Sequence, residues 1–466
     1  MLFSSISFLY YFLPLVLIFY FIVPFRFKNA VLLLFSLIFY FYGEPVYTFL
    51  MLGSTLSAYI HGLLIHKYRD TKLGKVFLWS SVTISLLSLG FFKYADFFIS
   101  NINGIFGSGI PLLKLALPIG ISFYTFQTMS YTIDVYRGEA APQRSYVKLA
   151  TYVSLFPQLI AGPIVRYTTV AEELESRKHS FENFAVGIRR FAVGLGKKVL
   201  IADLLGALAT ALHTTKNPSV AGYWLYAIAI SLQLYFDFSG YSDMAIGLGR
   251  IFGFHFLENF NYPFISKSVA EFWRRWHISL GSWFRDYVYI PLGGNRVNTL
   301  YWLRNIAVVW FLTGFWHGAD WTFIFWGLFF AVFLVLEKFW YNRIFIHLPK
   351  VFSHIYVTLV ILVSFVIFSG NGVSGMLSDL GNMFFVNGLP LWTKETAYYL
   401  GSYAIPLIVG IVGATPLIKK GVEWIRSSRI GWVVDVLEPV FLVAVLLAVT
   451  AYFVDGSFSP FLYFRF

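Results

Sequence analysis

The sequence predicts an all-α, polytopic integral membrane protein of about eleven spans, built as one helical bundle. Hydrophobic residues make up 58% of the 466 positions, charged residues only 12%, and aromatic residues 21%, with 52 Phe among them. The apolar residues gather in uncharged runs, and a helix that crosses a bilayer needs roughly 20 such residues. This composition describes a chain solvated by lipid rather than one folded around a single aqueous core.

The apolar runs fix the expected positions of the spans. Residues 1–25 carry no charge and no small-residue cleavage site, so the first run is expected to be a retained span and not a signal peptide. No linker, internal repeat or low-complexity tract marks a boundary, so we expect one transmembrane domain over residues 1–466. The predicted spans are residues 7–24, 30–42, 46–64, 76–92, 112–134, 223–249, 305–319, 321–337, 351–369, 402–418 and 437–454.

The charges lie between these runs. Thirty-five Lys and Arg against 23 Asp and Glu give a formal charge of +12, and in the first part of the chain the basic residues occupy every second junction. That distribution predicts an N-terminus outside and basic loops in the cytoplasm, against anionic headgroups; a nucleic-acid binder would instead gather the charge on one soluble face. The absence of cysteine excludes disulfides, thiolate nucleophiles and cysteine-bound metals.

Two stretches interrupt the simple pattern. Residues 151–165 are short and broken by Pro157, Gly162 and Pro163, which predicts a re-entrant hairpin buried in protein. Residues 166–190 read as a cytoplasmic connection with an amphipathic helix. An interfacial helix should follow, with the four basic residues that bracket it snorkelling to the headgroups: Arg189, Arg190, Lys197 and Lys198.

Asp237 and Asp243 are carboxylates within an apolar, aromatic span. Two carboxylates without histidine at ligand spacing are a weak signal for a metal, so no metal site is expected. Pairing with buried arginines or capping of broken helices is the favoured interpretation. The nearby glycines at 247, 249 and 253 lack the spacing and the preceding strand of a dinucleotide loop.

The stretch from Glu271 to Gly318 holds the candidate chemistry. Cations and aromatic residues surround His277, whereas His317 is the one strongly basic side chain in the uncharged segment 305–319. Polar groups at membrane depth are functional hypotheses by default. A neutral His317 could remove a proton from a bound hydroxyl or thiol, and His277 could accept or relay a proton. A second interpretation of each histidine is a hydrogen-bonded packing residue.

Four arginines accompany these histidines: Arg274, Arg275, Arg285 and Arg296. Guanidinium groups bind phosphate in a bidentate manner, so a cytoplasmic cluster is suited to a phosphate-bearing ligand. The alternative is a positive-inside loop at the lipid surface.

Residues 273–279 (WRRWHIS) and 316–318 (WHG) resemble the signature of the membrane-bound O-acyltransferase (MBOAT) family, in its bacterial polysaccharide O-acetylation branch. Further similar blocks cover most of the chain. They are residues 118–124 (PIGISFY), 131–138 (YTIDVYRG), 156–164 (FPQLIAGPI), 234–247 (LYFDFSGYSDMAIG) and 461–466 (FLYFRF).

The resemblance implies a helical bundle with a central tunnel in a bacterial cytoplasmic membrane. It implies that acetyl-CoA enters as the donor substrate, with no permanently bound cofactor, that His317 deprotonates the acceptor, and that His277 assists. Residues expected to bind the acyl donor or to line the tunnel are Arg274, Arg275, Trp276, Ser279, Arg285, Trp316, Gly318, Asp237, Tyr241, Pro157 and Pro163. Because the chain has no GDS sequence and no large soluble region, the resemblance also implies a separate extracytoplasmic SGNH-type acetyltransferase or acceptor protein as partner.

Other functions compete with acetyl transfer. D-alanyl transfer to a wall polymer is the alternative within the family. A polytopic transporter would also place charges and broken helices in the membrane, but it would favour inverted repeats, which the chain lacks. A structural subunit that anchors a glycosyltransferase complex would not need His317.

Overall fold

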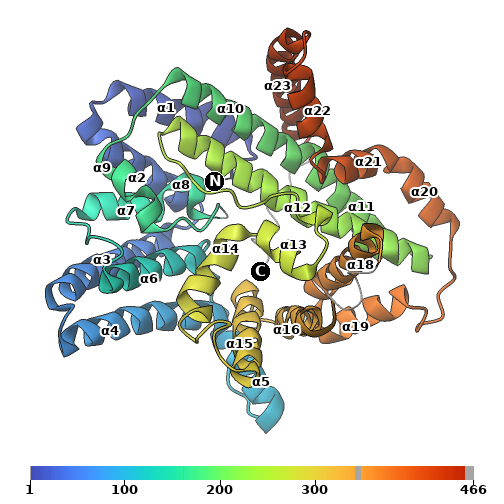
Figure 1. Ribbon diagram of the computed structural model, residues 1–466, viewed down its shortest axis with the longest axis horizontal. Coiled ribbons are helices and arrows are strands. Elements are labelled where there is room, and N and C mark those ends of the chain that lie inside the picture. Colours follow the sequence, from blue (N-terminus) through green and yellow to red (C-terminus); the bar gives the residue numbers. More distant parts are fainter. Residues whose placement is uncertain (1, 161, 342–347, 457–466) are drawn as a thin grey trace. The chain divides into compact units, whose positions relative to one another are not determined.

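The computed structural model describes residues 2–160, 162–341 and 348–456, and every regular element in these ranges is a helix (Figure 1). This confirms the all-α prediction. The described chain divides into two compact units. The first comprises Met1–Phe191 and Ser242–Leu257, and the second comprises Ala192–Tyr241 and Glu258–Phe466. The expectation of a single domain over residues 1–466 stays a prediction.

The first unit is built mainly from the N-terminal helices, with α3 packed against both α4 and α6. Gly62 of α3 allows a close approach to α6, because a Cβ at this position would lie 2.6 Å from Tyr131 Oη. The helices are α1 (Leu13–Ile22), α2 (Phe25–Phe41), α3 (Pro45–Tyr68), α4 (Lys72–Leu89), α5 (Ala95–Phe106), α6 (Ile121–Arg137), α7 (Tyr146–Ser154), α8 (Phe156–Leu159), α9 (Tyr167–Glu175) and most of α10 (Phe181–Gly196).

Two predictions in this unit meet different outcomes. The span expected at 112–134 is replaced by a helix that starts only at Ile121. Pro118 and Gly120, whose φ is +76°, hold the preceding chain out of helical conformation. The break expected in residues 151–165 is present, since α7 ends at Ser154 and α8 follows with Pro157 in its first turn; its re-entrant course stays a prediction.

The second unit contains the C-terminal helices. Its π-helical segment Lys197–Ala202 leads into α11 (Asp203–Thr214). The others are α12 (Val220–Ile251, whose last turns belong to the first unit), α13 (Val269–Arg275), α14 (Ile278–Phe284), α15 (Thr299–His317), α16 (Trp321–Leu336), α18 (Lys350–Ser369), α19 (Gly372–Met383), α20 (Lys394–Ser402), α21 (Ala404–Gly413), α22 (Leu417–Arg426) and α23 (Gly431–Val454).

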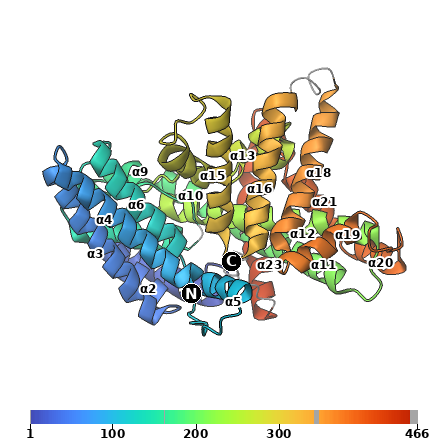
Figure 2. The same ribbon diagram turned by 90° about the horizontal axis from the view of Figure 1, so that it is seen from below.

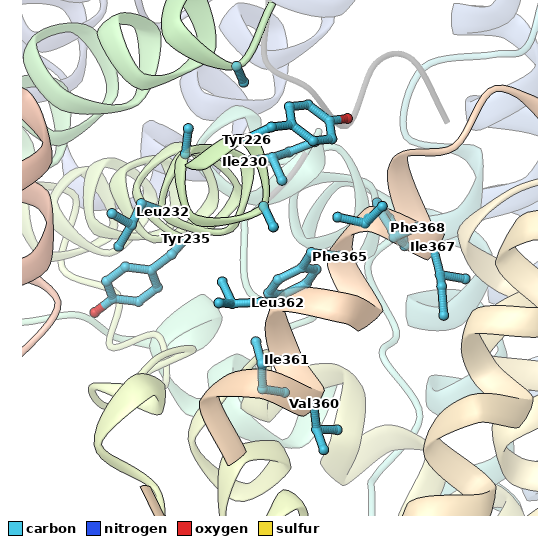
Figure 3. Close-up of a cluster of buried hydrophobic side chains, with 14 of the residues drawn as sticks. Tyr226, Ile230, Leu232, Tyr235, Val360, Ile361, Leu362, Phe365, Ile367 and Phe368 are labelled. Carbon is cyan, nitrogen blue, oxygen red and sulfur yellow. The ribbon is translucent and has the colours of Figure 1, made fainter. Parts of the chain in front are cut away.

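Within this unit α15, α16 and α18 run side by side, and α16 packs against both of its neighbours (Figure 2). A buried apolar cluster joins α12 to α18. Its side chains include Tyr226, Ile230, Leu232 and Tyr235 from α12, and Val360, Ile361, Leu362 and Phe365 from α18 (Figure 3). The cluster also includes Trp276, the residue before His277, so it packs against the turn that contains His277.

Five described helices are long and apolar enough to cross a membrane, or six if the bent pair α20 and α21 is one span. The chain is therefore a multi-pass membrane protein, but the count of about eleven spans is not confirmed. The span expected at 402–418 is shorter in the structure, because α21 covers only Ala404–Gly413 and is bent by 61° from α20, which ends at Ser402. The predicted family block at 461–466 lies outside the described residues.

Candidate active site

Both candidate catalytic histidines belong to the second unit. His317 is the last residue of α15, and His277 lies in the turn between α13 and α14. Pro157 and Pro163 belong to the first unit. Their role in lining a tunnel with the histidines therefore stays a prediction.

The orientation of His317 is set by its own helix. Its Nδ1 lies 2.7 Å from the backbone oxygen of Thr313, one turn earlier. A carbonyl oxygen only accepts hydrogen bonds, so Nδ1 carries the hydrogen and Nε2 is the basic nitrogen of the neutral ring. The side chain is buried, with ring centroids 4.8 Å from Trp326 and 5.6 Å from Phe368. His317 is thus a fixed base rather than a mobile one.

Three glycines bring α16 close to the end of α15 that carries His317. A Cβ at Gly314 would lie 2.3 Å from the backbone oxygen of Phe323, and one at Gly327 would lie 2.2 Å from that of Trp310. At Gly318 a Cβ would lie 2.1 Å from the Phe323 ring. Such approaches are shorter than any van der Waals contact, so a Cβ at Gly314 or Gly327 would collide with backbone, and one at Gly318 would have to displace the Phe323 ring. The glycine of the WHG motif, Gly318, is explained by this close packing against α16.

His277 is held in an unusual backbone conformation. Its φ of 46° and ψ of 53° are left-handed, a region that costs a residue with a Cβ roughly 1 kcal/mol or more. Its ring is 1% exposed and meets the edge of Phe238 at 4.6 Å between centroids. Strain of this kind persists only where the surroundings determine the conformation, and it is common at functional sites.

Hydrogen bonds also fix the ring of His277. Nδ1 lies 3.2 Å from Asn259 Oδ1 and 3.4 Å from Ser279 Oγ, whereas Nε2 has no hydrogen-bond partner among the residues that the structure describes. Burial lowers the pKa of His277 well below its ordinary value, and the nearby His317 lowers it further. The ring is therefore neutral at physiological pH, with a buried nitrogen that can accept a proton.

A cavity of about 340 Å³ adjoins His277. It is mostly apolar, and its wall runs from α13 and α14 to the face of α15 that includes Thr313, whose carbonyl oxygen orients His317. Two of the four predicted arginines, Arg274 and Arg285, line it. An apolar cavity with a few convergent polar groups is the usual form of a small-molecule site.

The arginine cluster is smaller than the sequence predicts. Arg275 is bound to Glu271, with its Nε 3.0 Å from Oε1, and Arg285 pairs with Asp286 at 2.7 Å. Arg296 is exposed in the loop before α15 and does not line the cavity. Arg274 is exposed and makes none of the ion pairs found in the described part of the chain, although it interacts electrostatically with Glu271 and Glu337. This leaves Arg274 as the guanidinium best available to an anionic ligand.

Asp237 belongs to a buried charge group. Lys198 lies 2.6 Å from Asp237 and 2.8 Å from Asp203, and the side chains of Lys198 and Asp237 are 4% and 2% exposed. The prediction that Lys198 snorkels to the membrane surface is therefore wrong, because its two carboxylate partners draw it inward. Asp243 pairs with Arg190 at 2.7 Å, which confirms pairing with an arginine for that residue. Tyr241 is buried on the same helix as Asp237.

Among the residues described, no group of three or more His, Asp or Glu side chains is placed to hold a metal ion. Trp276 and Trp316 are buried beside the histidines; the centroid of the Trp316 ring lies 6.1 Å from that of His277. Asn259, which sequence reasoning missed, contacts His277 directly. The only signal in the sequence was a polar residue between two aromatic-rich stretches, which is too common to single out.

An all-helical, multi-pass chain with two buried histidines, one of which lines a mostly apolar cavity together with two arginines, has the arrangement expected of a membrane-embedded acyltransferase. The chain belongs to the MBOAT, membrane-bound O-acyltransferase family, whose model matches residues 139–378. The resemblance stated from its motifs is thereby confirmed, and the matched range includes both histidines.

Named relatives agree with this assignment. A probable alginate O-acetylase AlgI of Azotobacter vinelandii is 38% identical over all of both chains. A peptidoglycan O-acetyltransferase of Helicobacter pylori is 33% identical over all of this chain and 98% of its own. A teichoic acid D-alanyltransferase of Bacillus subtilis is 31% identical over 50% of this chain and 62% of its own.

Proposed function

We propose that this acyltransferase moves an acetyl group from cytoplasmic acetyl-CoA across the membrane to an extracytoplasmic acceptor, for O-acetylation of an exported or cell-wall polysaccharide. The observation that carries the proposal is the pair of buried histidines, each with Nδ1 held by an oxygen acceptor and Nε2 left as its basic nitrogen. Two relatives that align with all of this chain are named an alginate O-acetylase and a peptidoglycan O-acetyltransferase, and these names support acetyl as the acyl group.

His317 is the proposed general base. Its Nε2 takes the proton of the acceptor hydroxyl while the oxygen attacks the thioester carbonyl carbon. The carbon–sulfur bond then breaks, and the departing thiolate receives a proton to leave as coenzyme A. In this scheme His277 accepts or returns a proton at the neighbouring position, since its own Nε2 is buried and unprotonated.

Arg274 and the cavity beside His277 are the proposed site for the donor. The guanidinium of Arg274 would pair with a phosphate of coenzyme A, as charge-assisted hydrogen bonds to phosphate are short and strong. Apolar walls suit the pantetheine arm and the acetyl group, and they keep water from the thioester. Trp316, Trp276 and Ser279 would shape the passage between the donor and His317.

The proposal includes a location and a partner. The protein would lie in the bacterial cytoplasmic membrane with its N-terminus outside, as the basic junctions predict. A separately encoded SGNH-type acetyltransferase or acceptor protein outside the membrane would receive the acetyl group, because the chain carries no GDS sequence of its own. The final polysaccharide is set by that partner rather than by the His317 site.

A second candidate is D-alanyl transfer to a wall polymer. It is favoured by the relative named teichoic acid D-alanyltransferase, although that likeness extends over only half of this chain. The likeness of the whole chain to an alginate O-acetylase and a peptidoglycan O-acetyltransferase supports acetyl as the first candidate.

Purified full-length protein in nanodiscs, given acetyl-labelled coenzyme A, tests the proposal by thioester loss and by label transfer to a periplasmic extract. We expect His317→Ala to lower turnover by about 10²- to 10⁴-fold, the usual contribution of a general base. His66→Ala, a change at an exposed histidine at the end of α3, is the matched control and should keep wild-type turnover.

Full acetyl transfer by His317→Ala would remove His317 from its role. Absence of turnover in the wild type, together with turnover of a D-alanyl carrier, would select the second candidate. Absence of both would favour a transporter without chemistry.

A further inference from the structure

The side-chain oxygen of Asn259 contacts several polar groups of the turn that contains His277. Asn259 Oδ1 lies 3.2 Å from His277 Nδ1, 3.1 Å from the backbone nitrogen of Ser279 and 2.9 Å from Ser279 Oγ. The backbone oxygen of Asn259 accepts a further bond, at 3.0 Å, from the nitrogen of Ile278. Asn259 is 0% exposed and lies 18 positions before His277 in the chain.

These contacts determine which nitrogen of His277 carries the hydrogen. The backbone N–H of Ser279 can only donate, so the atom that faces it must be the amide oxygen of Asn259. The hydroxyl of Ser279 donates to the same oxygen and leaves its own oxygen as an acceptor. Both groups near Nδ1 are therefore acceptors, and the neutral ring must place its hydrogen on Nδ1.

We propose that Asn259 is a positioning residue that holds His277 as the Nδ1–H tautomer, so that Nε2 is the nitrogen that exchanges a proton with the substrates. This inference rests on the proposed function of His277 in acyl transfer. It gives His277 the same tautomer as His317, which obtains it from the Thr313 carbonyl. Without an acceptor at Nδ1, the hydrogen would distribute between the two nitrogens and the ring would lose its fixed direction.

Asn259 also supports the strained backbone of the turn. Two of the four contacts named above are with backbone N–H groups that follow His277, whose φ is +46°. A purely structural role would explain those two bonds. It would not require the bond to the ring, so a test must report on the ring itself.

Several other ionisable groups surround this site. His317 lowers the pKa of His277, and Arg274 and Arg285 line the same cavity. The elements packed against α13 and α14 also carry Asp286, Glu337 and His354. None of these forms a hydrogen bond with His277 Nδ1, which among the described residues contacts only Asn259 and Ser279.

Three variants of the full-length protein in nanodiscs test the inference. Asn259→Ala removes the acceptor. Asn259→Asp keeps acceptors for all three donors but adds a negative charge beside Nδ1, which favours the protonated ring. Asn387→Asp makes the same chemical change at an exposed asparagine whose amide donates hydrogen bonds to Ser378 and Asn382, and it serves as the control.

We expect Asn259→Ala to lower kcat for acetyl transfer by about 10- to 1000-fold with little change in KM, since a misdirected catalytic histidine is costly. Asn259→Asp should recover part of that activity at high pH and move the acid limb of the pH profile upward by about one unit or more. The control should keep the wild-type profile. An unmoved profile in Asn259→Asp, in a protein that turns over with His317 intact, would overturn the inference while leaving the proposed function in place.

A spectroscopic measurement keeps the inference testable with any acyl donor. In ¹⁵N-histidine-labelled protein, assigned by comparison with His277→Gln, two-bond ¹⁵N–¹H correlations distinguish the two tautomers. His277 should be the Nδ1–H form in the wild type and a mixture or the Nε2–H form in Asn259→Ala. The same pure tautomer in both would overturn the role of Asn259, whatever the reaction.

Discussion

The turn at His277 and the helix end at His317 present the same imidazole tautomer by different means. His317 uses the carbonyl oxygen of its own helix, 2.7 Å away, and continues a regular backbone. His277 lies in a left-handed conformation and depends on the side chain of Asn259, on a distant loop. The first arrangement is local, whereas the second needs the tertiary structure of the second unit.

This difference teaches where the site is vulnerable to substitution. The hydrogen bond of His317 is made to the backbone, so no side-chain change removes it directly; only displacement of α15 does. The hydrogen bond of His277 can be deleted by one substitution at Asn259. The sequence motifs identify His277 and His317 equally well, but one side-chain substitution can remove the hydrogen bond that orients His277 and none can directly remove that of His317.

The largest effect that breaks the local arrangement is expected from Gly314→Val. The Cβ of the new valine would lie 2.3 Å from the backbone oxygen of Phe323, which is too close for a contact, so α15 and α16 must separate. Overpacking of this kind costs about 1–3 kcal/mol, and misplacement of a catalytic group by 1 Å can cost about 10²-fold in rate. Thermal unfolding in nanodiscs and acetyl turnover measure the two effects.

Gly421→Val is the matched control for that prediction. Gly421 lies inside α22, where a Cβ meets nothing within 4 Å. The control should keep both the unfolding temperature and the turnover. Equal behaviour of the two variants would show that the close packing of α15 on α16 does not position His317.

A smaller effect should separate the two neighbouring arginines. Arg274→Gln removes an exposed cation that lines the cavity, and loss of a hydrogen bond to a phosphate at about 1.5–3 kcal/mol should raise KM for acetyl-CoA by about tenfold or more. Arg275→Gln breaks the pair with Glu271 and should change KM by less than about twofold. Steady-state kinetics decide the matter; equal KM values would remove Arg274 from the donor site.

The smallest effect is expected from Thr313→Val. Thr313 orients His317 through its backbone oxygen, while its hydroxyl only bonds the Val309 carbonyl within the helix. An isosteric valine keeps the carbonyl, so kcat should fall by no more than about threefold. A loss as large as that of Asn259→Ala would contradict the contrast between backbone and side-chain support.

The sequence predicted the residues of this site better than the hydrogen bonds and ion pairs between them. The WRRWHIS and WHG motifs identified both histidines, because an imidazole in an uncharged apolar run stands out by chemistry alone. Asn259 did not stand out, since its value comes from a contact across 18 positions that no helical or strand period predicts. The bond between Arg275 and Glu271 follows the i,i+4 rule and was within reach of sequence reasoning.

The helices show the same limit. Most predicted apolar runs became helices, because hydrophobic length is read directly from composition. The run at 112–134 lost its first part to Pro118 and Gly120, and the run at 402–418 was reduced to α21, which a bend separates from α20. Lys198 escaped prediction for a different reason: its position depends on Asp237, a carboxylate in another helix.

The buried group of Lys198, Asp203 and Asp237 includes a counterion for the lysine that is close to it in the chain. A lysine in an apolar environment is costly without a counterion, and Lys198 is synthesised before α12 exists. Asp203, 5 residues later and 2.8 Å from Lys198, is available as soon as this part of the chain leaves the ribosome. Asp203 can therefore pair with Lys198 until α12 and its Asp237 have been synthesised, so Lys198 need not enter the bilayer without a counterion.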